Sequence, residues 1–245
     1  YQNHLLISLY KVENKKEKIE DFKTAISSTI RSLSNSEKIQ VSFGNEISKS
    51  EKNSIRLPEL NQINNKLNFN KIRAIADSKS LRYRFSDPKT FKQYEPEGNI
   101  SKQLYKISEK IRCEKIGTSY FKGVKNNIET FYHERISGLD LKSSEDKIVE
   151  SFENYLRTKF LDFENNSQID KKLKSYKKDL NEKFKGKISQ LNDCTLDQEK
   201  FNSLISELIT NMNLDENLDE EEKKDDDKND DDKQNKPDNK EKQAK

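Results

Sequence analysis

Apolar side chains recur every three or four residues in one segment after another of this chain, which is the spacing of one face of an α-helix. Such stripes occupy residues 18–34, 69–85, 101–116, 119–136, 145–160, 169–191 and 201–212. The 245 residues include only 6 glycines and 4 prolines, which suits helices better than a turn-rich β-sandwich. We therefore expect a mainly α fold, a helical bundle in which the stripes form the core.

One short segment predicts a strand instead. Ile39, Val41 and Phe43 alternate with polar residues, and Gly44 ends the run. The following stretch, through the sequence RLPEL at 56–60 and the asparagine-rich residues 61–65, reads as a charged loop and an irregular connector. The strand contribution to the fold should therefore be minor.

Breaks between the helical stripes define the order of the bundle. The pair Asp87–Pro88 should stop the helix that begins at Phe69, because a residue before proline is driven out of the helical region. Gly117 should separate two helices, and Ser143 and Ser144, before Glu145 and Asp146, should form the N-terminal cap of another. The apolar stripe at 169–191 is sustained for about six turns and predicts one long helix.

Charge is distributed unevenly along the chain. The formal net charge is +3, from 47 Lys and Arg and 44 Asp and Glu. Residues 215–245 contain 14 acidic and 8 basic residues, which leaves 39 basic and 30 acidic in 1–214. A segment so poor in apolar residues cannot offset the entropy of ordering. We expect a helical domain at 1–214 and a disordered acidic linker or tail at 215–245.

Few residues offer catalytic or metal-binding chemistry. The two histidines are His4 and His133, and the two cysteines, Cys113 and Cys194, lie far apart, as free thiols in a reducing cytoplasm would. Neither a zinc-ligand cluster nor a glycine-rich nucleotide-binding motif is present in the sequence. Asp77 begins the string DSKS, which departs from a metal-ion-dependent adhesion motif, and we expect it on a helix surface or in an interhelical salt bridge.

Two alternatives follow from the residues alone. A basic helical body could bind nucleic acid, although its lysines alternate with glutamates as on solvated helix faces. His133 could act as a base in an enzyme, although it falls toward the polar side of its helix. No apolar run reaches the length of a membrane span, so we expect a soluble protein. Because the first residue is Tyr, the chain reads as a fragment or a processed product.

Several motifs, taken in order, resemble the N-terminal region of the CobT subunit of aerobic cobaltochelatase. They are Leu57–Pro58, Ala76–Asp77, the Leu-Arg-x-Arg of residues 81–84, Ser86–Asp87, the Arg-x-Glu-x-x-Gly of 112–117 and the Gly-Val-x-x-Asn of 123–127, followed by the acidic tract. Ser86 departs from the family, which usually has histidine there. The resemblance covers about residues 39–222 and is strongest at 109–129.

The resemblance implies a role in a larger assembly. CobT proteins work with a CobS-like AAA+ ATPase and a CobN-like large chelatase subunit, and the complex uses ATP, Mg and cobalt to metallate hydrogenobyrinate a,c-diamide in aerobic cobalamin biosynthesis. The family's metal-ion-dependent site lies in a von Willebrand A domain beyond the acidic linker, and this sequence ends inside that linker. We therefore expect no catalytic, cofactor-binding or metal-binding residue here. A related alternative is that the chain belongs to a pair of this family, an AAA+ ATPase with a von Willebrand A protein, that acts on another substrate.

The matching positions are candidates for structural or subunit contacts rather than chemistry. Arg112 and Glu114 are expected to tie the helices around Gly117 to their neighbours. The full candidate set is Asp77, Arg82, Arg84, Asp87, Arg112, Glu114, Gly117, Gly123 and Asn127.

Overall fold

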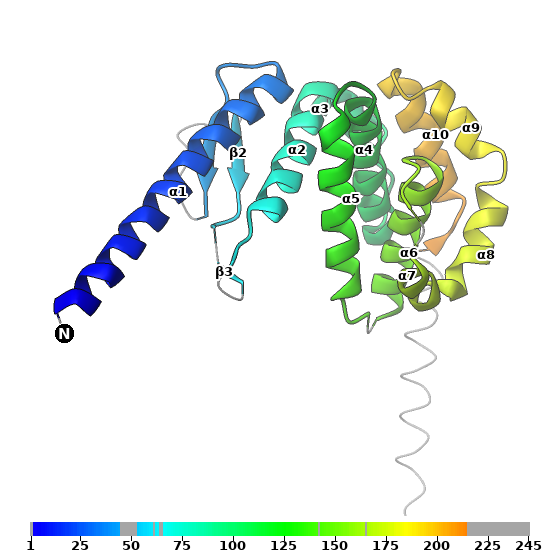
Figure 1. Ribbon diagram of the computed structural model, residues 1–245. Helices are drawn as coiled ribbons and strands as arrows, with labels where there is room; N and C mark the ends of the chain where they lie inside the picture. Colours follow the sequence, from blue (N-terminus) through cyan, green and yellow to red (C-terminus); the bar gives the residue numbers. More distant parts are fainter. Residues whose placement is uncertain are drawn as a thin grey trace, which may run out of the picture.

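A computed structural model gives the fold of residues 2–44, 53–60, 62–63, 66–141, 143–164 and 166–214. It is mainly helical, as the apolar stripes predict (Figure 1). The acidic tract 215–245 and the charged loop at 45–52 lie outside the described residues, so the expected boundary at 214 and the disorder beyond it stay predictions.

The elements follow one another along the chain with short connections. In order they are α1 (Gln2–Ser34), β1 (Gln40–Phe43), β2 (Ser54–Leu57), β3 (Gln62–Ile63), β4 (Lys66–Leu67), α2 (Phe69–Phe85), α3 (Pro88–Gln93), α4 (Asn99–Tyr120), α5 (Lys122–Ser137), α6 (Ser144–Lys159), α7 (Ser167–Lys172), α8 (Lys174–Lys183), α9 (Lys187–Asp193) and α10 (Gln198–Thr210).

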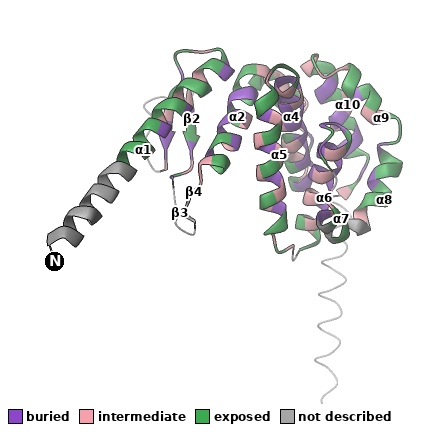
Figure 2. Ribbon diagram, in the orientation of Figure 1, coloured by how far each residue is buried: buried purple, intermediate pink, exposed green. Residues whose placement is uncertain are grey.

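Helix α2 lies between two hydrophobic cores. On one side, α1 and the strands β1 and β2 bury apolar residues against its first half, including Ile72 and Ala76. On the other side, Leu81 in its second half joins the larger core shared by α4, α5, α6, α8 and α10. Figure 2 shows the buried residues following the inner faces of these helices. The position of α2 therefore couples the amino-terminal layer to the helical bundle.

The strand predicted at Ile39–Phe43 is confirmed as β1, and Gly44 ends it with φ +58°. The prediction of an irregular connector after it is wrong in part. Residues 54–57 form β2, which pairs in parallel with β1 so that Gln40 faces Ser54 and Phe43 faces Leu57. Burial of Ile55 and Leu57 beside an exposed Arg56 explains why this short segment is a strand. Two-residue strands β3 and β4 form a small antiparallel pair.

Gly117 does not separate two helices, contrary to the sequence prediction. It lies inside α4, which continues to Tyr120, and the break falls at Phe121, with φ −124° and ψ 95°. The glycine is needed for packing instead of for a turn. A Cβ atom at Gly117 would lie 2.8 Å from Cγ of Leu81 and closer still to its methyl carbons, so only glycine lets α2 and α4 approach this closely.

The single long helix expected at 169–191 is also wrong. Three short helices, α7, α8 and α9, occupy this region. Gly186 has φ +72°, a left-handed conformation that ends α8 and starts α9 at an angle. The turn lets Leu180, Phe184 and Leu191 all reach the same core.

Side-chain caps fix the start of two helices where the sequence suggests. The Ser143 hydroxyl accepts a hydrogen bond from the backbone N–H of Asp146 at 3.0 Å, which confirms it as the cap of α6. Helix α2 stops before Pro88 as predicted, and the Asp87 carboxylate then caps α3 by accepting from the N–H of Thr90 at 2.8 Å.

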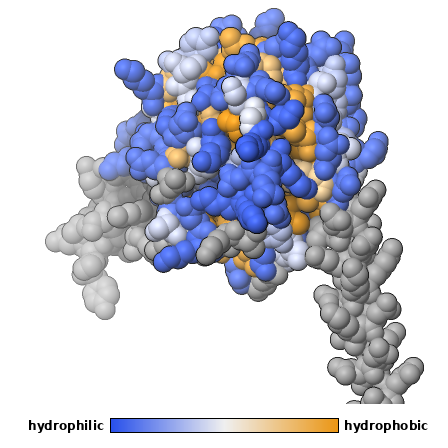
Figure 3. All heavy atoms as spheres, turned by 90° about the vertical axis from the view of Figure 1, so that its right-hand side faces the viewer, coloured by the Kyte–Doolittle hydropathy of each residue, from blue (hydrophilic) through white to orange (hydrophobic). Residues whose placement is uncertain are grey.

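The surface is predominantly polar. Figure 3 looks onto the side that carries α8 and α9, where hydrophilic side chains cover much of the face and apolar ones lie between them. Among the helices of the described ranges, none is long and apolar enough to cross a membrane.

The close approach of α2 to α4 can be tested by substitution. Gly117→Ala should lower the free energy of unfolding by about 1–3 kcal/mol, because the added methyl group overpacks the contact with Leu81. Gly123→Ala is the matched control, since a Cβ there meets nothing within 4 Å and should leave the midpoint of urea unfolding unchanged or higher. Equal midpoints for the two variants would contradict the packing argument.

Candidate functional site

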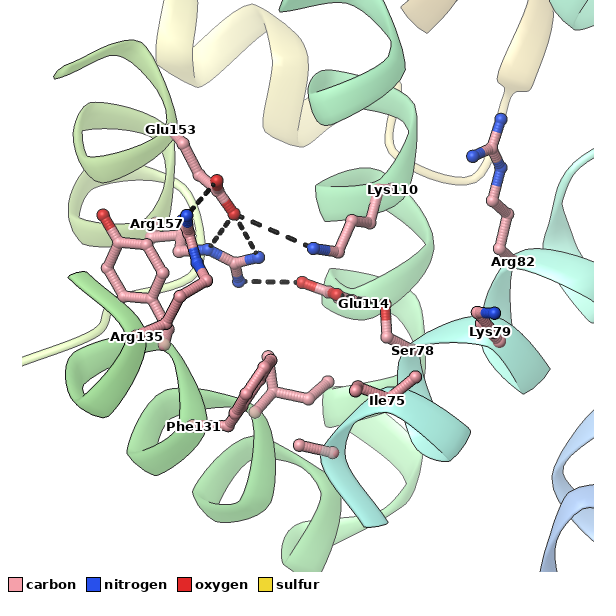
Figure 4. Close-up of a pocket in the computed structure, with 13 residues that line it drawn as sticks. Ile75, Ser78, Lys79, Arg82, Lys110, Glu114, Phe131, Arg135, Glu153 and Arg157 are labelled. Atoms are coloured by element: carbon pink, nitrogen blue, oxygen red, sulfur yellow. Dashed lines mark hydrogen bonds and ion pairs between the residues drawn. The ribbon is translucent and has the colours of Figure 1, made fainter. Parts of the chain in front are cut away.

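A cavity of about 230 Å³ lies among α2, α4, α5 and α6. Figure 4 shows Ile75 and Phe131 on one side of it and Lys110, Glu153 and Arg157 on the other. Each of the four helices therefore contributes to the lining, and the cavity has both an apolar and a charged wall. It is the candidate functional site.

The charged wall is built around a buried arginine. Arg157 on α6 is 1% exposed and donates to the Glu114 carboxylate of α4 at 2.9 Å and to Glu153 of its own helix at 2.7 and 2.8 Å. The second oxygen of Glu114 accepts from the Ser78 hydroxyl on α2 at 2.6 Å. An isolated buried charge is very costly, so these partners are what permit the charges to lie inside the protein. Three helices are thereby joined.

Glu153 receives three cations. Besides Arg157, it pairs with Arg135 of α5 at 2.8 Å and with Lys110 of α4 at 3.8 Å. Burial alone raises the pKa of the Glu153 carboxyl, but attraction from Arg157, Lys110 and Arg135 outweighs it and brings the pKa down to about 2. Arg135 is also held by a two-point contact with Glu150 at 2.6 and 2.8 Å. The carboxylate therefore stays ionised and joins α4, α5 and α6.

Aromatic rings complete the environment of Arg157. Its guanidinium lies 4.8 Å from the ring centre of Tyr132 and 5.4 Å from that of Phe163. The Tyr132 hydroxyl donates to Asn154 at 3.2 Å. Burial by itself lowers the pKa of Arg157. Attraction to the Glu114 and Glu153 carboxylates has the larger effect, so the pKa of Arg157 lies above its ordinary value.

A second, more open cavity of about 610 Å³ adjoins the first across α2. Lys79 and Arg82 line both cavities, and Arg56 of β2 lines the outer one. The Lys79 ammonium donates to the Arg56 carbonyl at 2.6 Å. Burial, with repulsion from Arg56, lowers the pKa of Lys79. Positive charge is thus concentrated where the two cavities meet.

Asp77 lies inside the protein, not on a helix surface as expected. It is 3% exposed, and its carboxylate accepts a hydrogen bond at 2.8 Å from the Asn127 amide of α5. The contact is interhelical, but it is a hydrogen bond and not the salt bridge that was the alternative. Burial raises the pKa of Asp77 to about 6, with the Asn127 hydrogen bond and Arg73 opposing the rise.

Arg112 is the centre of a second buried set of ion-pair and hydrogen-bond contacts, on the other face of α4. Its guanidinium pairs with Glu109 through two contacts of 2.8 Å and donates to the carbonyls of Phe85 at 2.5 Å and Thr195 at 3.0 Å. These bonds tie α4 to the end of α2 and to the loop before α10. The expectation that Arg112 and Glu114 link their helix to its neighbours is confirmed, whereas a role in subunit contact stays a prediction.

The other candidate residues lie at separate places. Arg82 enters the cavity lining and stacks over Phe91 at 5.2 Å, and Arg84 donates to the carbonyl of Leu33 at the end of α1 at 3.3 Å. Asp87 caps α3, and Gly123 is exposed at the start of α5. The structure therefore brings Arg82 and Glu114 to one cavity and pairs Asp77 with Asn127, while Arg84, Asp87 and Gly123 stay apart.

Sequence reasoning missed the residues that define the cavity: Lys110, Arg135, Glu153 and Arg157. Glu153 and Arg157 are four residues apart on a helix, a spacing that ordinarily marks an exposed ion pair. The available signal was their position beside Phe152 and Leu156 of the apolar stripe.

His133 is half-buried against Phe163. Both cysteines are free, and within the described ranges no three His, Cys, Asp or Glu side chains gather as metal ligands.

Breaking the buried ion-pair network should destabilise the bundle. Arg157→Met should lower the free energy of unfolding by about 3–5 kcal/mol, because Glu114 is left buried without its cation. Adding Glu114→Gln should recover part of the loss, since it removes the unpaired charge. Urea unfolding measures both. Lys200→Met, at an exposed pair with Asp197, is the control and should leave the midpoint unchanged.

The buried Asp77 predicts a pH dependence of its own. Its folded pKa of about 6 lies above the ordinary value of 3.8, so the folded chain takes up a proton more readily than the unfolded chain. Its contribution to stability is present at low pH and is lost as the pH rises through 6. The wild type should therefore lose stability relative to Asp77→Asn as the pH rises. Between pH 4 and pH 7, the difference in free energy of unfolding should change by about 1–3 kcal/mol in favour of Asp77→Asn, as measured by urea unfolding at each pH. Parallel pH profiles would contradict the assignment.

Comparison with known proteins agrees with the motifs placed above. The family described as cobalamin biosynthesis protein CobT matches residues 16–245, which is nearly the whole chain and includes α2, α4, α5 and α6. No solved structure matches the chain. With a family match of this length, the chain belongs to the CobT family of cobalamin biosynthesis proteins.

Proposed function

We propose that the chain is a non-catalytic subunit of an ATP-dependent cobaltochelatase, which inserts cobalt into hydrogenobyrinate a,c-diamide during aerobic cobalamin synthesis in the cytoplasm. The observation that carries the proposal is the CobT family match over residues 16–245. Membership in that family associates the chain with cobalamin biosynthesis and its cobaltochelatase. The role within the complex is our inference.

The proposed partners are a CobS-like AAA+ ATPase and a CobN-like large chelatase subunit. In this arrangement ATP and Mg bind to the ATPase, and cobalt is a substrate of the whole complex. The chain transmits the conformational change of the ATPase to the chelatase subunit. Such transmission requires that the helices be bonded to one another, so that displacement of one helix displaces its neighbours. The buried bonds that Glu114 makes to Ser78 of α2 and Arg157 of α6 fit that requirement.

The same contacts favour an adaptor over the alternatives. Glu114, Glu153 and Arg157 are of the residue types that do acid–base and electrostatic work in active sites, but here each already bonds to side chains of neighbouring helices. A nucleic-acid-binding surface needs basic side chains that reach solvent. Two of the arginines, Arg112 and Arg157, are almost fully buried in ion pairs and cannot contact phosphates.

Reconstitution with the two partners tests the proposal. The full chain should co-purify with the CobS-like ATPase, and cobalt insertion should require the chain, the ATPase, the CobN-like subunit and ATP together. The chain alone should neither hydrolyse ATP nor insert cobalt. Failure to bind the ATPase, or cobalt insertion by the chain unaided, would overturn it. If the chain binds the ATPase but cobalt insertion does not depend on the chain, the result would instead favour another substrate for the chain and its ATPase.

A further inference from the structure

The cavity between α2, α4, α5 and α6 carries more positive than negative charge. Five cations line it, namely Lys79, Arg82, Lys110, Arg135 and Arg157, against the carboxylates of Glu114 and Glu153. Glu150, outside the lining, offsets Arg135. A surplus of two positive charges therefore remains, and it lies on the side of the cavity lined by the exposed residues Lys79 and Arg82.

Three of these cations lack a close carboxylate. Among the described residues, neither Lys79 nor Arg82 forms an ion pair, and Lys110 reaches Glu153 only at 3.8 Å. The oxygens of Glu114 and Glu153 are occupied by Ser78, Arg157 and Arg135. The lowered pKa of Lys79 agrees with a cation that has been partly desolvated without a counter-charge. An anion entering the cavity would supply what is missing.

The opposite wall is apolar. Ala74, Ile75, Ile128 and Phe131 belong to the lining, and Figure 4 shows Ile75 and Phe131 across the space from Lys110 and Arg157. A simple inorganic anion would leave this wall uncovered. A ligand with an anionic group on an apolar body satisfies both walls at once, because binding sites combine apolar contact area with a few polar groups that orient the ligand.

We infer that this cavity binds a small organic acid, with a carboxylate or phosphate near Lys110, on the side of the cavity that Lys79 and Arg82 also line, and a compact apolar body against Ile75 and Phe131. The volume of about 230 Å³ limits the body to about one ring or a short branched chain, below the range of about 300–1,000 Å³ for drug-sized ligands. The inference goes beyond the proposed function, since no step of cobalt insertion depends on it. The bound acid bridges α2 and α4 with an additional contact.

Two probes can test the site on the full chain by isothermal titration calorimetry in low-salt buffer at pH 7.5: 3-phenylpropionate and phenyl phosphate. At least one should bind with sub-millimolar Kd, and the ratio of the two identifies the preferred anionic group. The uncharged 3-phenylpropionamide should bind at least tenfold more weakly. Binding should also raise the thermal midpoint as the probe concentration increases.

Variants distinguish the cavity from general attraction to a basic protein. Lys110→Met and Arg82→Met should each weaken binding at least tenfold. The Lys110 side chain is 40% exposed and has one long ion pair, so we expect its replacement to leave the chain folded. Lys102→Met removes a cation of α4 outside the cavity, paired with Glu97 at 3.8 Å, and should change Kd less than twofold.

Three results would overturn the inference. They are no binding of either acid at 10 mM, equal binding of the amide and the acid, and wild-type affinity in both Lys110→Met and Arg82→Met. Urea midpoints of each variant confirm that a loss of binding comes from the missing cation and not from unfolding.

Discussion

The bundle depends on the pairing of one buried guanidinium with two carboxylates. Arg157 cannot lie beneath the surface unless Glu114 and Glu153 meet it, and Glu114 reaches it only if α4 and α6 are in register. The Ser78 hydroxyl extends the same requirement to α2, and Arg135 extends it to α5. Together with the close apolar packing of Gly117 against Leu81, this set of directional bonds selects one arrangement of the helices.

Much of the fold could be predicted from the sequence, because helix formation leaves a periodic trace. The stripes at 69–85 and 145–160 correspond closely to α2 and α6, and Ser143 and Pro88 mark real boundaries. The errors have physical causes. Gly117 was interpreted through its backbone freedom, but it is required by the approach of Leu81, a residue 36 positions earlier in the chain. Only the tertiary structure reveals such a constraint.

The candidate site was harder to predict than the fold. Arg112 and Glu114 stood out through the family motif, whereas Glu153 and Arg157 looked like an ordinary exposed pair of one helix. Whether a charged pair faces water or a partner helix depends on crossing angles and on residues far away in sequence. Likewise, β2 is stabilised by β1 and by α2, and four residues of modest strand propensity could not indicate that by themselves.

Helix α2 has a consequence for how force passes through the molecule. Its first half is embedded in the layer of α1 and the strands, and its second half forms the wall that carries Ser78, Lys79 and Arg82. A displacement of α1 would therefore act on the same helix that lines the cavity. If the amino-terminal layer were to shift α2, the shape of the cavity would change with it, and by linkage a ligand in the cavity would oppose that shift.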